Sequence, residues 1–145
     1  MPVTVKRITL WRAEVENRPG TLAQTLAPFA AARTDLQVVM GYRYPAADGK
    51  AAIEVCPVAG KKLAAAAAGV GLAASAIPTL IVEGDNKPAL GHALAQAIAD
   101  AGINLGFIVA QVVGRKYSAV LGFESDADAK KAAQLIKKVT VKKAK

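Results

Sequence analysis

The sequence predicts an α+β protein made of two βαββαβ units in tandem, each an antiparallel sheet with helices on one face. Three observations lead to this class. A short loop motif occurs twice, segments rich in Val, Ile and Leu alternate with alanine-rich helical segments, and Pro, Gly, Asp or Asn separate them. At 145 residues and 53% hydrophobic content, the chain suits one domain or two very small ones and is too apolar for intrinsic disorder.

The repeat lies in the segments Val15–Leu22 and Val82–Leu90. Matching residues are separated by 69 positions in the pairs Asn17/Asn86 and Pro19/Pro88. Leu22 and Leu90 are separated by 68, which indicates that the second loop lacks one residue after its proline. We therefore expect a first unit over 1–73, a second over 74–141 with a strand near 77–83 at the boundary or shared, and a basic tail at 142–145. Units this small should share buried surface.

The first copy begins with a strand over residues 5–16, where Ile, Leu, Val and Trp alternate roughly with polar residues. Pro19 suits the first position of the following helix, which runs to about residue 33 and bends at Pro28. The remaining elements are a strand at 36–44, a turn at 45–49, a strand at 50–57, a short helix at 61–68 and a strand at 77–83.

The second copy repeats this order. Its elements are a helix over 88–101 ended by Gly102, strands over 104–113 and 117–123, a helix from Ser125 or Asp126 to about residue 138, and a short closing strand at 139–141. Each copy then follows the ferredoxin-like plan of an antiparallel sheet with two helices on one face.

The two loops also resemble the ACT domain family of small regulatory modules. In that family a first strand runs into a motif like Asn17–Leu22, and the segments Asp85–Leu90 and Ala101–Leu105 resemble it too. The resemblance implies binding of an amino acid or similar small ligand at interfaces between paired units, usually to regulate an attached enzyme. With no attached catalytic domain in 145 residues, the chain resembles stand-alone tandem ACT proteins of bacteria.

The chemistry of the loops is compatible with such a ligand. Unpaired N–H groups at a helix start attract a carboxylate, and Gly20 permits close approach while Thr21 adds a hydroxyl. Asn17 or Asp85 can accept from an ammonium, although Asp85 can equally cap its helix, and either loop can be a capping turn without ligand. The candidate ligand-binding residues are Asn17, Arg18, Gly20, Thr21, Leu22, Asp85, Asn86, Ala89, Leu90 and Asn104.

Other functions find less support. The net charge of +8 comes largely from lysines after residue 136, with few aromatic residues nearby, which favours a solvated tail over a nucleic-acid site. One cysteine, Cys56, and one histidine, His92, give no metal cluster, and no Ser–His–acid set is visible. We expect no cofactor and no catalytic activity; an enzyme of the acylphosphatase type lacks its arginine-loop signature here.

Location and partners complete the expectations. The stretch 63–74 is too short to span a membrane and no export signal is visible, so we expect a cytoplasmic protein, with a composition typical of bacteria. The strands at 80–82 and 106–110 are apolar on both faces, which predicts cover by the other copy or another subunit. We therefore expect a homodimer, and as an alternative function a regulatory subunit or scaffold that controls a separate enzyme.

Overall fold

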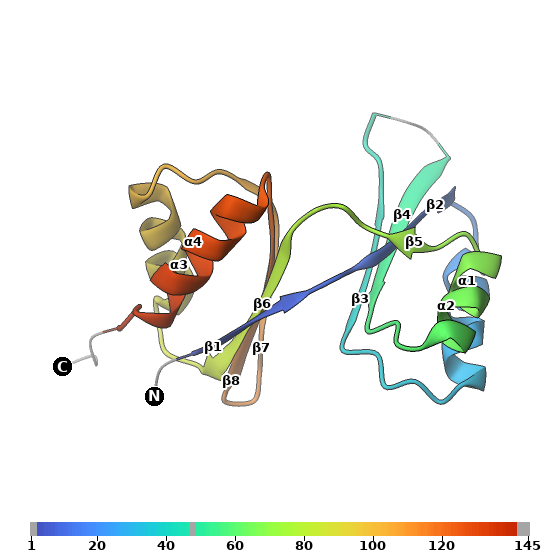
Figure 1. Cartoon of the computed structure of the whole chain (residues 1–145), viewed down its shortest axis with the longest axis horizontal. Coiled ribbons are helices and arrows are strands. Elements are labelled where there is room, and N and C mark those ends of the chain that lie inside the picture. The colour runs from blue at the N-terminus through green and yellow to red at the C-terminus, as the bar shows by residue number, and fades with distance from the viewer. Residues whose placement is uncertain (1–2, 47–48, 142–145) are drawn as a thin grey trace. The chain divides into compact units, whose positions relative to one another are not determined.

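The computed structural model describes residues 3–46 and 49–141 (Figure 1). Its elements are β1 (Thr4–Ile8), β2 (Trp11–Glu16), α1 (Thr21–Ala31), β3 (Val38–Arg43), β4 (Lys50–Cys56), α2 (Lys61–Gly69), β5 (Ala73–Ala74), β6 (Thr79–Asp85), α3 (Leu90–Asp100), β7 (Leu105–Val113), β8 (Lys116–Phe123) and α4 (Asp126–Lys137). They form two compact units: the first unit is residues 9–76, and the second unit combines residues 3–8 with 77–141.

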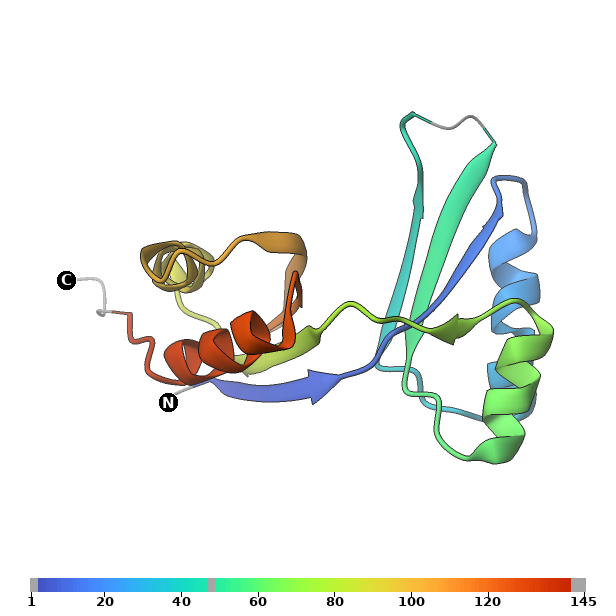
Figure 2. The ribbon, with the colours of Figure 1, turned by 45° about the horizontal axis from the view of Figure 1, so that its top comes forward.

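The first unit is a complete βαββαβ motif. Its antiparallel sheet has the order β3-β4-β2-β5, and α1 and α2 lie together on one face of it (Figure 2). The buried core under these helices consists of Ala13, Phe29, Ile53, Val55, Ala67 and Leu72. The predicted helix over 61–68 and the hairpin of β3 and β4 are confirmed. The closing strand of this unit is β5, which pairs with β2 and was not predicted, in place of the strand expected at 77–83.

The second unit has the same architecture but takes one strand from the beginning of the chain. Its sheet has the order β1-β6-β8-β7, and β1 pairs antiparallel with β6 from Thr4 opposite Glu83 to Ile8 opposite Thr79. β1 therefore occupies the place of the fourth strand. Beneath α3 and α4, the core includes Leu94, Ile98, Leu121 and Ile136, none more than 2% exposed.

This arrangement corrects several expectations about the N-terminal half. The single strand over 5–16 is wrong, because the chain divides at Thr9–Leu10 and sends β1 to the second unit and β2 to the first. The first unit thus does not extend over 1–73. The strand expected near 77–83, at the boundary or shared, is β6, which begins just after the boundary and belongs to the second unit alone. β1 covers the edge of β6, whose residues 79–82 are all buried.

The closing strand expected at 139–141 is also wrong. Val139 and Val141 pack against the core of the second unit without strand structure, because β1 already pairs with β6. The starts of two helices also differ from the prediction, which placed Pro19 and Pro88 at the first helical position. Both prolines lie in turns, and α1 and α3 begin two residues later, at Thr21 and Leu90.

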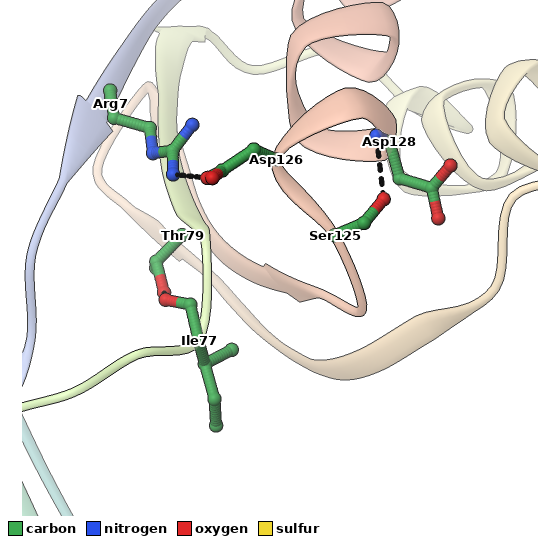
Figure 3. A network of polar contacts seen from close by, with 6 residues as sticks. All are labelled: Arg7, Ile77, Thr79, Ser125, Asp126 and Asp128. Carbon is green, nitrogen blue, oxygen red and sulfur yellow. Dashed lines mark hydrogen bonds and ion pairs between the residues drawn. The ribbon is translucent and has the colours of Figure 1, made fainter.

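The start of α4 shows how β1 is fastened to the second unit (Figure 3). Ser125 caps the helix by accepting a hydrogen bond from the Asp128 backbone N–H at 3.1 Å, as predicted. Arg7 of β1 forms an ion pair with Asp126 in the first turn of α4. At the start of β6, the Thr79 hydroxyl donates to the Ile77 carbonyl at 2.9 Å.

Within residues 3–46 and 49–141, the helices are too short or too polar to span a lipid bilayer. The same residues contain no group of three or more His, Cys, Asp or Glu side chains placed to hold a metal ion.

Candidate functional site

The loop between β2 and α1 is built around two backbone features. Gly20 has φ +89°, a left-handed conformation that other L-residues adopt only with strain. The Asn17 N–H donates to the Gly49 carbonyl at 2.8 Å, which holds the loop against the β3–β4 turn. The first turn of α1 has no side-chain cap, so its N–H groups remain suited to an anion.

This loop borders a cavity of about 290 Å³ in the first unit. The cavity brings together predicted residues from the loop with residues of β3 and β4 that the repeat did not indicate. Its lining is Val15, Glu16, Asn17, Arg18, Thr21, Leu22, Gly41, Tyr42, Arg43, Ala51, Ala52 and Ile53. Gly20 is not among them. A second cavity of about 280 Å³ lies on the other side of Thr21, toward Thr25 and Val70.

Two side chains of the cavity, Thr21 and Arg43, have polar groups without a partner in the described part of the chain. The Thr21 Oγ1 is buried without a partner among the described residues, an arrangement that native proteins rarely tolerate. Arg43, also on the cavity wall, has no ion pair with the part of the chain that the structure describes. Arg18 differs, because it is engaged by Glu16 and Gln24, each at 3.4 Å. A carboxylate in the cavity would lie beside Thr21 and beside Arg43, whose guanidinium has no ion pair among the described residues.

Tyr42 connects the cavity to the helix-free face of the sheet. Its hydroxyl donates to the Oε2 of Glu54 at 2.9 Å. Burial raises the pKa of Tyr42, and although Arg12 lowers it, the neighbouring Glu54 raises it further. Tyr42 is therefore a neutral donor at physiological pH.

The second loop follows the same backbone path. The Asn86 N–H donates to the Arg115 carbonyl at 2.8 Å, and Ala89, at φ +68°, precedes α3 as Gly20 precedes α1. The separation of 69 residues thus holds through the loop, and Thr21 corresponds to Leu90. The prediction that the second loop lacks a residue is wrong.

The predicted residues of the second loop are less available than those of the first. Asp85 forms an ion pair with Lys116 at 2.5 Å, which lowers its pKa, and it does not cap α3. Asn104 donates from Nδ2 to the Glu124 carboxylate at 3.0 Å. A cavity of about 310 Å³ reaches this loop, lined by Val3, Asp85, Lys87, Leu90, Val139, Thr140 and Val141. Asn86 and Ala89 are not in that lining.

Two further residues behave as packing and surface groups. Cys56 is buried, and that burial raises the pKa of its thiol, so the unreactive thiol predominates at neutral pH. His92 is exposed on α3.

Comparison with known proteins places this fold. Neither the protein-family models nor the curated proteins searched gave a match. Among solved structures, a Bacteroides thetaiotaomicron protein is similar with a TM-score of 0.71 and 12% identity over 93% of this chain and 99% of that chain. The aspartate kinase regulatory subunit from Thermus thermophilus, in ligand-free form, is similar with a TM-score of 0.63 and 15% identity, over 97% of this chain and 98% of that chain. The corresponding subunit from Thermus flavus has a TM-score of 0.55 and 17% identity, over 94% of this chain and 97% of that chain. At these identities the likeness shows the fold, and the chain has the tandem ACT-like arrangement of two βαββαβ units.

Proposed function

We propose that the protein is a non-catalytic regulatory protein of the bacterial cytoplasm that binds an amino acid in the cavity beside Asn17–Leu22. The observation that carries the proposal is the cavity itself, where the uncapped start of α1 meets Arg43 and Thr21, whose buried hydroxyl has no partner among the described residues. A donor in this position stabilises a ligand that supplies the missing acceptor. The similarity to aspartate kinase regulatory subunits supports the same role.

The lining of the cavity suits a small acid with a compact apolar side chain. The ligand carboxylate would accept from Thr21 and from Arg43, and Val15, Leu22 and Ile53 would contact its apolar part. A volume of about 290 Å³ lies at the lower end of the range for ligand pockets, which favours a molecule of single amino-acid size.

Thermal unfolding with each of the twenty proteinogenic amino acids tests this function. At a hundredfold excess over its dissociation constant, a ligand should stabilise the protein by about 2.7 kcal/mol. We expect at least one amino acid to raise the unfolding temperature, and Thr21→Val or Arg43→Ala to remove most of that increase. Arg115→Ala, an exposed arginine of the second unit, is the matched control and should keep it. An unchanged unfolding temperature with every amino acid at millimolar concentration would contradict the proposal.

A second candidate function is a regulatory subunit that controls a separate enzyme. The observation favouring it is length, since this chain covers 98% and 97% of two proteins that are aspartate kinase regulatory subunits. This function predicts co-elution with an aspartate kinase catalytic subunit in size-exclusion chromatography. If the two proteins do not associate, with or without an amino acid that binds, this second function is contradicted and the chain acts as a ligand sensor on its own.

We also propose that the protein is a homodimer formed through β7. This nine-residue strand lies at the edge of its sheet and exposes apolar side chains on both faces, at 45% for Ile108, 47% for Val109, 49% for Val112 and 66% for Val113. A long apolar edge strand is prone to pair with another chain. Pairing with β7 of a second copy about a two-fold axis would cover it and close the assembly.

A further inference from the structure

The register of the two sheets identifies one position where the units differ sharply. In the first unit, Ala51 of β4 stands opposite Val15 on one side and Arg43 on the other. In the second unit, Tyr117 of β8 stands opposite Gly84 and Val112 in the same way. Because the loops correspond residue for residue, Ala51 and Tyr117 occupy equivalent places beside equivalent helix starts.

The side chains at these places have opposite effects on the space next to them. The Ala51 methyl lines the cavity of about 290 Å³, together with Leu22 of α1. Tyr117 is 6% exposed and belongs to the core of the second unit. Its hydroxyl lies 3.6 Å from the position that a Cβ on Gly91, the counterpart of Leu22, would occupy. The tyrosine ring therefore reaches from β8 to the first turn of α3 and fills the volume that is open in the first unit.

The two side chains proposed to bind the ligand carboxylate have apolar counterparts in the second unit. Leu90 stands in place of Thr21, and Val112 in place of Arg43. The cavity of about 310 Å³ at the second loop lies toward Val3 and Val139–Val141, so it corresponds to the cavity on the Val70 side of Thr21.

We propose that Tyr117 closes the second unit to the ligand and that the Ala51/Tyr117 position determines which unit is open, giving one ligand site per chain. The inference rests on the proposed function, because it requires that the open cavity of the first unit binds an amino acid. Burial raises the pKa of Tyr117, in agreement with a hydroxyl that has no partner among the described residues and acts by its volume.

Amide chemical shifts of the ¹⁵N-labelled full chain test this inference, with each proteinogenic amino acid added separately. In the wild-type protein, an amino acid that binds should move the amides of Thr21 and Leu22 and leave those of Leu90 and Gly91 in place. Ala51→Tyr should abolish the shifts at Thr21 and Leu22. Tyr117→Phe, which keeps the volume and removes the hydroxyl, should behave as wild type.

A second experiment introduces the side chains of the first cavity into the second unit and tests whether that unit gains binding. The triple variant Leu90→Thr, Val112→Arg and Tyr117→Ala should add shifts at Gly91 and His92 while those at Thr21 remain. Movement of the Leu90 and Gly91 amides in the wild-type protein, or binding unaffected by Ala51→Tyr, would overturn the inference even if the triple variant fails to fold. Amides that stay fixed at both loops with every amino acid would instead overturn the proposed function.

Discussion

A chain that lacks residues 1–8 is expected to lose the fold of the second unit and keep that of the first. β1 supplies five residues of pairing to β6 and contributes Arg7 to the ion pair with Asp126. Val3, 7% exposed, belongs to the core of the second unit, and Val5 packs against that core. Since burying a valine contributes about 1.5–3 kcal/mol, the loss approaches the 5–15 kcal/mol that stabilises a typical domain. Amide exchange should show protection retained at β4 and lost at β8.

A circular permutant supplies the control for this deletion. Val3 and Val141 line the same cavity, so a short linker can join the end of the second unit to β1. A chain of residues 77–145, a linker and residues 2–8 should then fold without the first unit. Residues 77–145 alone should not. If the deletion left β8 protected, β1 would not be an integral strand of the second unit.

Replacing Val109 and Val113 together by lysine is expected to convert the homodimer to a monomer. Both side chains point to the helix-free face of the edge strand β7, since they stand opposite Val120 and Lys116, and both are largely exposed in the single chain. Charged residues at an edge oppose pairing of strands, and each substitution acts twice in a symmetric dimer. We expect dissociation to increase on the order of 100-fold, about 2.7 kcal/mol, in sedimentation equilibrium.

The control places a single lysine on the edge of the other sheet. Val39 of β3 is 45% exposed, and Val39→Lys should leave the association constant of the dimer unchanged. A monomeric wild-type protein at micromolar concentration, or a dimer that Val39→Lys disrupts and the β7 variant does not, would contradict the assignment of the interface to β7.

The order of helices and strands could be predicted because it depends on local sequence patterns. Alternation and turn residues located β3, β4, β7 and β8, and Ser125 marked the start of α4. The partner of a strand is a non-local property, so residues 5–16 read as one strand although the chain divides between two sheets. Val139–Val141 looks like a strand by composition, but β1 occupies the β6 edge and leaves these residues to pack as irregular chain.

Only part of the candidate site could be predicted, because the rest depends on the non-local pairing of strands. The repeated loop motif identified Asn17, Thr21 and Leu22, which the cavity brings together. Arg43 and Ala51 enter the cavity through the hairpin register, which no spacing in the sequence reveals. Knowledge of that register would also have shown that Tyr117 stands where Ala51 does.

A crystal structure of the protein grown with a pool of the twenty proteinogenic amino acids tests the central claim most directly. The account predicts density for one amino acid in the cavity of the first unit, with its carboxylate within hydrogen-bond distance of the Thr21 Oγ1 and Arg43. A cavity that holds only water, or an amino acid bound elsewhere with Thr21 still unpartnered, would contradict it.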